Sequence, residues 1–442
     1  MSQLTKIIVL DDDPTGSQTV HGCLLLTRWD VPTLVGALQD ASPLFFVLTN
    51  TRGMSAERAE AVTREVCANV RIALEQEGAA GRAINPILVS RSDSTLRGHY
   101  PVETDVIAEE LGPFDAHFLT PAFFEGGRVT RDSIHYLMVS GEPVPVHETE
   151  FARDSVFGYR HSYLPDYVAE KTSGRIAAEQ VERFTLADVR GDISARLLAL
   201  KDNVCGVVDA EQQSDLDRFA AQIQTAAATG KRFLCRSAAS LLTSLAQLGP
   251  QPVAPQQMAA YVRGGRAGAV IVGSHVKKTT SQLAELLKQP GVAGLEVDVE
   301  RIAVDRVALL EEVRLAAEAA HARNETPVVY TSRVEKTFAD QTTRLAFGEQ
   351  VSAFLMDVVR NLPLSIGFLI SKGGITSNDV LSDGLALRTS RVLGQILAGC
   401  SVVRCPVDHP RYPDLPVVIF PGNVGDDNAL ATVYNRLRGN TD

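Results

Sequence analysis

The stretch that decides the fold is residues 7–16, IIVLDDDPTG. An apolar run that ends in acidic residues and a Pro/Gly turn is typical of a buried parallel strand with carboxylates at its C-terminal end. Open α/β sheets bind their ligands at that edge. Crowded carboxylates repel one another unless a cation, a proton or a hydroxyl-rich ligand is present, so the stretch predicts a binding site. The alternative is an acidic cap on the helix that follows.

The composition is that of a globular enzyme. The chain has 442 residues and a formal net charge of −10, with 45% hydrophobic and 22% charged residues, which argues against wholesale disorder. This length predicts two or three domains, and the scattered basic residues argue against a nucleic-acid partner. The start of the chain does not resemble a signal peptide, and no apolar run approaches a membrane span of about 18 residues. Six cysteines without a CxxC pair indicate reduced thiols, so we expect a cytoplasmic protein.

Short apolar runs alternate with longer amphipathic stretches along the first half of the chain. This alternation predicts βαβ units and a mostly parallel sheet. Residues 143–166 are rich in His, Arg and Asp and only weakly periodic, which predicts a long functional or mobile loop. The predicted strands are 6–10, 43–50, 85–90, 116–121, 204–210 and 232–235, and the predicted helices include 55–76 and 101–111.

A Pro/Gln-rich stretch, LGPQPVAPQQ at 248–257, separates this half from a second alternating set. We therefore expect an α/β fold of two Rossmann-like lobes with mostly parallel sheets, joined by this linker. The predicted domains are residues 1–247 and 258–442. The predicted strands of the second lobe are 268–274, 294–299, 327–332, 365–372 and 416–421.

Polar residues end the first four recognisable strands of the first lobe. Neighbouring parallel strands would bring these ends to one rim, where Asp, Ser and Thr hold hydroxyls and Arg clamps a carboxylate or phosphate. A polyhydroxy acid would satisfy all of these groups at once. The fourth strand end is the run PAFFEGGR at 121–128. The predicted substrate-binding residues are Asp12, Asp13, Arg52, Arg91, Ser92, Asp93, Ser94 and Arg97.

Glycine turns follow three predicted strands of the second lobe. Backbone N–H groups of such turns, at the start of a helix, are suited to hold phosphate oxygens. Thr376 and Asp379 also have the spacing of a capping box. The chain contains neither a Walker A motif nor GxGxxG, so the common nucleotide folds are disfavoured. The turns predict a nucleotide site made by Ser274, Gly373, Gly374, Ile375, Thr376 and Gly422.

These segments resemble the four-carbon acid sugar kinases, a family formerly without a known function. The likeness runs in order over nearly the whole chain. It implies a sugar-acid-binding N-terminal domain and a nucleotide-binding C-terminal domain. It also implies transfer of the ATP γ-phosphoryl group, with Mg²⁺, to the terminal (C4) hydroxyl of D-threonate, D-erythronate or 3-oxo-tetronate, and leaves a homodimer possible. The motifs are DDPTG at 12–16, DSTLRG at 93–98, PAF with GR within 121–128, HETEFARD at 147–154 and GGITS at 373–377.

Two departures from the family pattern concern the second lobe. Many members end in KSGNFG, where this chain has FPGNVG at 420–425, and many have Glu at the position of Ile375. The lysine that could touch phosphate is therefore absent. Lys372, immediately before the glycines, is a candidate to supply that charge.

The kinase hypothesis assigns roles to the polar rim. Arg52 and Arg97 are expected at the substrate carboxylate or at the transferring phosphoryl group. The catalytic base is expected to be Asp13 or Asp93, because a carboxylate within hydrogen-bond reach must accept the proton of the attacking hydroxyl. Asp13 is favoured because the turn Pro14-Thr15-Gly16 would fix its direction.

Two other functions are open from the sequence. Asp11 and Asp13 fit the DxDxT nucleophile motif of haloacid-dehalogenase-type phosphatases, in which the first Asp attacks phosphorus. That reading leaves residues 92–99 and 373–377 unexplained. A non-catalytic sugar-acid-binding protein would account for the rim but not for the three glycine turns.

Overall fold

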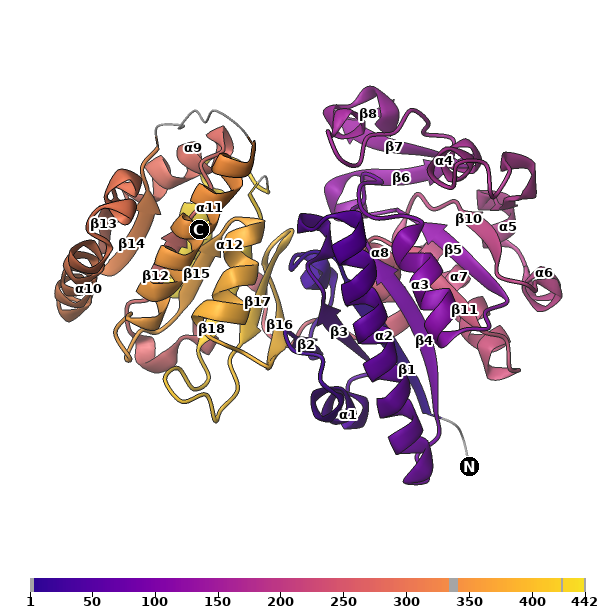
Figure 1. The fold of residues 1–442 in the computed structure, drawn as a ribbon, viewed down its shortest axis with the longest axis horizontal. Helices are drawn as coiled ribbons and strands as arrows, with labels where there is room; N and C mark the ends of the chain where they lie inside the picture. The colour runs from indigo at the N-terminus through magenta and orange to yellow at the C-terminus, as the bar shows by residue number, and fades with distance from the viewer. Residues whose placement is uncertain (1–3, 334–340, 423, 441–442) are drawn as a thin grey trace. The chain divides into compact units, whose positions relative to one another are not determined.

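The computed structural model describes residues 4–333, 341–422 and 424–440. They form two compact units, Met1–Gly249 and Pro250–Asp442, which are considered one at a time below (Figure 1). Each unit is an α/β structure built around a mostly parallel sheet, which confirms the predicted fold class. Among the described residues, no helix is long and apolar enough to span a bilayer.

The sheet of the first unit is parallel throughout. The chain leaves β1 for β2 and β3 on one side and then crosses to β4 on the other side. Ligands of open α/β sheets bind at such a switch point, outside the C-terminal ends of the strands. The strand order is β2 (Leu24–Leu26), β3 (Leu44–Leu48), β1 (Leu4–Asp11), β4 (Ile84–Arg91), β11 (Phe233–Ser237), β5 (Ala116–Thr120), β10 (Val204–Val208) and β9 (Glu182–Phe184).

Helices cover both faces of this sheet. α1 (Val31–Gln39), α2 (Ala56–Ala79) and α3 (Val102–Leu111) bury their apolar stripes against β1, β3 and β4 (Figure 1). α7 (Gln213–Ala228) packs on the opposite face through a cluster of aromatic side chains that includes Phe233. The next residue of β11, Leu234, points to the other face, where it belongs to the core beneath α1, α2 and α3. The remaining helices are α4 (Leu164–Lys171), α5 (Leu186–Arg190), α6 (Ser194–Ala199) and α8 (Ala239–Ala246).

A separate antiparallel sheet follows β5. It consists of β6 (Arg128–Arg131), β7 (Ile134–Val139) and β8 (Glu142–Pro145), and two short 3₁₀ helices, Val146–Glu148 and Glu150–Arg153, lead on toward α4. The prediction of a loop at 143–166 is therefore wrong in part. Its anchoring side chains, among them Val146 and Tyr159, are buried but irregularly spaced, so no periodic pattern reveals them.

The second unit has a five-stranded parallel sheet extended by an antiparallel pair that the sequence did not predict. α9 (Lys277–Leu286) and α13 (Ala429–Arg438) pack against one face, and Met258, which directly follows the predicted linker, is buried in the same core. The order is β13 (Val292–Val297), β14 (Thr326–Thr331), β12 (Ala269–Val272), β15 (Leu369–Lys372), β18 (Pro416–Phe420), β17 (Cys400–Arg404) and β16 (Thr389–Leu397). The other helices are α10 (Arg306–Ala322), α11 (Gln341–Arg360) and α12 (Gly374–Asp379).

Candidate active site

The predicted rim forms at the C-terminal ends of β3, β1 and β4. In the register of these strands, Asp11 lies beside Leu48 on one side and Arg91 on the other. The backbone N–H of Arg52 also donates to the carbonyl of Asp12, at 3.2 Å. The fourth predicted strand end is not a direct neighbour, because β11 lies between β4 and β5.

Arg52 is the centre of the rim. Its Nη2 and Nε donate to the two carboxylate oxygens of Asp12, at 2.5 and 3.1 Å. Its Nη1 lies 3.5 Å from Asp13 Oδ2 and 3.9 Å from Asp93 Oδ1. Burial acts to lower the pKa of Arg52, but the three carboxylates raise it well above its ordinary value. One guanidinium thus holds three carboxylates from two strand ends together.

Asp13 is held in a fixed direction by its own turn. Its Oδ1 accepts hydrogen bonds from the Thr15 backbone N–H, at 2.8 Å, and from the Thr15 hydroxyl. Burial opposes ionisation, but Arg52, Arg91 and Thr15 together hold the pKa of Asp13 below its ordinary value. The short helix that follows has Thr15 as its N-cap, so the acidic-cap interpretation is not supported for Asp13.

Asp93 is paired more tightly than Asp13. It accepts a 2.8 Å bond from Arg97 Nε and another from the Thr95 hydroxyl, and it faces Arg52. Burial would raise its pKa, but Arg52 and Arg97 hold it well below the usual range. In Asp13 and in Asp93 alike, one carboxylate oxygen accepts hydrogen bonds and the other faces Arg52 Nη1.

The loop that carries Asp93 is clamped by the sheet and helix that follow β5. Three consecutive carbonyls, those of Ser94, Thr95 and Leu96, each accept a hydrogen bond from a buried side chain. Leu96 has a left-handed backbone, with a φ of 66°, so the loop needs this support. The donors are His135 Nε2 at 2.7 Å, Tyr159 Oη at 2.7 Å and Tyr167 Oη at 2.8 Å, respectively.

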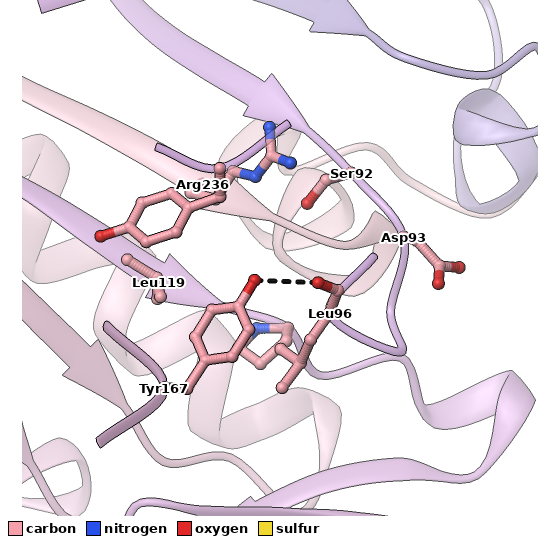
Figure 2. Close-up of a pocket in the computed structure, with 8 residues that line it drawn as sticks. Ser92, Asp93, Leu96, Leu119, Tyr167 and Arg236 are labelled. Carbon is pink, nitrogen blue, oxygen red and sulfur yellow. Dashed lines mark hydrogen bonds between the residues drawn. The ribbon is translucent and has the colours of Figure 1, made fainter. Parts of the chain in front are cut away.

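A small cavity lies beside this loop (Figure 2). It measures about 20 Å³, which is room for about one water molecule. Tyr167 and Leu96, which are joined by a hydrogen bond, are both among the residues that line it. Arg236, at the end of β11, lines it together with Ser92 and Asp93. The predicted strand 232–235 ends one residue too early to include Arg236, and its partner Glu103 lies on a helix, so no local pattern indicates this pair.

Arg128 is a second residue that was not among the predicted ligands. One Nη donates to the carbonyl of Gly126, while Nε is buried and bonded by no described residue. Burial lowers the pKa of Arg128 and Arg97 lowers it further, while Asp93 and Glu150 act to raise it. Among the described residues, no carboxylate forms a salt bridge with its guanidinium.

Asp11 lies behind the rim. Its side chain is fully buried, its carboxylate oxygens accept no hydrogen bond from the described residues, and Arg91 Nη1 approaches to 3.4 Å. Burial raises its pKa to about 8. A Cβ on Gly16 would stand only 2.1 Å from Asp11 Oδ2. A carboxylate enclosed in this way cannot reach a phosphorus atom, which argues against the phosphatase reading.

The predicted nucleotide residues also come together, at the adjacent C-terminal ends of β12, β15 and β18. Thr279 Oγ1 lies 3.3 Å from both the Ser274 hydroxyl and the Gly422 carbonyl. Gly373 has a φ of 118°, and a Cβ there would meet the Ser274 side chain at 3.2 Å. Three neighbouring strands thus present backbone turns and hydroxyls at one edge.

Three details concern the predicted glycine turns. Gly373, not Thr376, is the N-cap of α12, so the capping box is wrong; Asp379 instead accepts a hydrogen bond from Ser352. Ile375 is 73% exposed at the start of the helix that Gly374 opens. Position 423 of the predicted third turn lies outside the described residues. No group of three metal-ligating side chains occurs in the part of the chain that the structure describes.

Two family comparisons cover most of the chain. Residues 7–245 match the family described as a sugar-binding N-terminal domain, and residues 269–430 match a nucleotide-binding C-terminal domain. A D-erythronate kinase from Heliobacterium modesticaldum is 27% identical over 405 residues, which cover 88% of this chain and 80% of that protein. A D-threonate kinase from Bordetella bronchiseptica is 27% identical over 307 residues, 67% of this chain and 66% of that protein.

Solved structures share the fold. A Salmonella typhimurium LT2 protein aligns with a TM-score of 0.71 at 19% identity, covering 98% of both chains. A Haemophilus influenzae protein of the DUF1537 family aligns with a TM-score of 0.63 at 18% identity, covering 98% of this chain and 99% of that one. At these identities the likeness establishes the fold alone.

Replacing Asp11 with asparagine should change how stability depends on pH. Because the folded-state pKa of Asp11 is raised to about 8, the folded chain keeps a proton that the unfolded chain loses near pH 4. The contribution of this group to stability therefore falls as the pH rises from about 4 to about 8. Asp11→Asn stays neutral, so its melting temperature relative to wild type should rise between pH 5 and pH 8.5.

Calorimetric melting curves over this pH range test that expectation. Asp202→Asn, at an exposed position, is the matched control and should follow the wild-type curve. Parallel curves for Asp11→Asn and wild type would show that Asp11 is ionised like any surface carboxylate.

Proposed function

The chain belongs to the four-carbon acid sugar kinase family, and on that basis we propose that it transfers the γ-phosphoryl group of ATP to the terminal hydroxyl of a four-carbon sugar acid. The observation that carries the proposal is the cluster of Asp13, Arg52, Asp93 and Arg97 at the switch point of the unit matched as sugar-binding. The substrate would be D-threonate, D-erythronate or 3-oxo-tetronate, phosphorylated at C4.

The substrate hydroxyls would bind at the rim. Ser92, Asp93 and Ser94 offer a run of polar groups on a loop whose backbone is held in place, which suits recognition of vicinal hydroxyls. Asp13 would accept the proton of the attacking hydroxyl. Its low pKa makes it a weak base, but phosphoryl transfer depends more on alignment and charge stabilisation than on base strength. Arg52, beside Asp13, would steady the charge that develops there.

The substrate carboxylate would bind near Arg97 and Arg128. Arg97 lies over the Phe151 ring, 5.0 Å from its centroid, and 3.7 Å from Asp154, so its guanidinium is fixed by the segment after β8. Arg128 comes from β6. Asp93 and Asp154 already lie at Arg97, whereas no described carboxylate forms a salt bridge with Arg128, so Arg128 is the guanidinium that would pair with the substrate carboxylate.

The nucleotide would bind to the second unit, against Ser274, Gly422 and the turn from Gly373 to Thr376. Backbone N–H groups can approach phosphate oxygens where no side chain intervenes. A Mg²⁺ ion bound with ATP would neutralise charge on the phosphates. Because the described residues offer no three-ligand cluster, phosphates and water would supply most of its ligands, as is common for this ion.

A coupled assay of ADP release tests the proposal. We expect release with Mg²⁺-ATP and at least one isomer of threonate, erythronate or 3-oxo-tetronate. Neutral tetritols, which lack the carboxylate, should be poor substrates. Hydrolysis of phosphate esters without ADP release would favour the phosphatase alternative. Binding of a sugar acid without any turnover would favour the non-catalytic one.

Asp13→Asn should lower kcat by about 10²-fold or more, the scale of general-base catalysis, with little change in melting temperature. Asp30→Asn is a matched control, because Asp30 is the N-cap of α1 and asparagine caps equally well. It should keep wild-type turnover. An Asp13→Asn enzyme that retains its kcat but melts early would leave Asp13 with a structural role only.

Arg128→Gln should raise KM for the sugar acid by about tenfold or more, the cost of losing one hydrogen-bonded charge partner. It should also narrow the preference for the acid over the neutral tetritol. Arg131→Gln removes an arginine from the same strand that is paired with Glu211 at the surface, and it should have no such effect. An unchanged KM in an active Arg128→Gln enzyme would place the carboxylate elsewhere.

A further inference from the structure

Lys372 is a buried lysine without a carboxylate partner. It is the last residue of β15 and is fully shielded from solvent. Its Nζ donates to the carbonyl oxygens of Pro421, at 2.6 Å, and Gly422, at 3.2 Å, and lies 4.1 Å from the centre of the Phe420 ring. No carboxylate among the described residues is within 4.0 Å of it. A buried ammonium is costly to keep without an anion, so its retention calls for a reason.

The contacts of Lys372 join two of the turns in the second unit. Lys372 lies beside Phe420 in the parallel register, and the N–H of Gly373 donates to the Phe420 carbonyl at 2.8 Å. The ammonium draws the Pro421 carbonyl inward. Because N–H and C=O point in opposite directions across a trans peptide, the N–H of Gly422 then points away from Lys372.

We propose that Lys372 is a positioning residue of the nucleotide site. It holds the Gly422 turn so that the backbone N–H of Gly422 points outward, and its positive charge, on the inner side of the turn, attracts the nucleotide phosphates. This inference rests on the nucleotide site of the proposed function. Lys372 does not touch the nucleotide, since its Nζ is enclosed by the two carbonyls and the Phe420 ring. It supplies charge through the turn, where the low dielectric of the interior preserves the attraction.

The protonation of Lys372 should therefore be coupled to nucleotide binding. Burial lowers its pKa to about 7, while the Cys400 thiol on β17 raises it and Lys278 on α9 lowers it further. Phosphates that arrive nearby favour the charged form. Below pH 7 the group is already protonated, whereas above pH 7 the free protein has to take up a proton when the nucleotide binds.

Titration calorimetry of the full chain with ADP measures this proton directly. Runs in buffers of different ionisation enthalpy give the protons taken up per ADP, at pH 6 and pH 8, for wild type and Lys372→Met. The difference between the two proteins cancels the protons that the ADP phosphates exchange, because these are the same in both titrations. At pH 8 wild type should take up as much as about one proton more than Lys372→Met, and at pH 6 the difference should vanish.

Two further variants separate a positioning role from a merely structural one. Lys288→Met removes an exposed lysine that bonds Glu285 at the surface, and it should keep the wild-type proton uptake at pH 8. Lys372→Arg keeps a charge that is not lost below pH 12, so it should lose the extra uptake yet bind ADP at pH 8 at least as tightly as wild type. Lys372→Met should bind ADP about tenfold more weakly at pH 6.

The outcomes distinguish this inference from the proposed function. A wild-type protein that does not bind ADP at either pH would overturn the nucleotide site itself. Binding of ADP with the same affinity and the same proton uptake in wild type and Lys372→Met would overturn the role of Lys372 alone. If Lys372→Met does not fold, wild type and Lys372→Arg decide: equal proton uptake in these two proteins also contradicts the inference.

Discussion

The candidate active site depends on three hydrogen bonds from buried side chains to one loop. The carbonyls of Ser94, Thr95 and Leu96 would each be costly to bury unpaired, and the backbone at Leu96 is left-handed. The donors come from β7 and from the segment that ends in α4, which lie more than thirty residues further along the chain. The small antiparallel sheet and the segment that ends in α4 thus act together to fix the loop that carries Asp93.

His135 shows how this support is kept independent of pH. Burial lowers its pKa to about 4, so the ring stays neutral at physiological pH. Nδ1 lies 2.9 Å from the Thr130 hydroxyl and accepts from it, which leaves Nε2 to donate to Ser94. A single tautomer therefore satisfies both partners. The buried histidine therefore has a structural role in the site: it holds the Ser94 carbonyl.

The sequence was sufficient to predict the neighbouring strands that carry the first site residues. It was insufficient to predict the later strand that the fold places between two of the earlier ones. β1, β3 and β4 are adjacent and carry Asp13, Arg52 and Asp93 to one edge, because each ends an apolar run in a polar turn. β11 lies between β4 and β5 in the sheet, although it follows them by over a hundred residues in the sequence. No local sequence pattern predicts that Arg236, at its end, lines the cavity. The register of neighbouring strands and the order of strands in the sheet depend on tertiary packing, so local sequence patterns do not predict them.

The second unit shows the same limit in a different form. The glycine turns were visible as turns, but the capping box was wrong because Gly373, with its positive φ, takes the N-cap position. Lys372 appeared in the sequence as a charge that could reach outward to phosphate. The structure turns it inward, onto two carbonyls. Because the Lys372 side chain is buried and bonded to these carbonyls, it does not reach a ligand directly. Under our proposal it acts on the nucleotide through the position and charge of the turn that it holds.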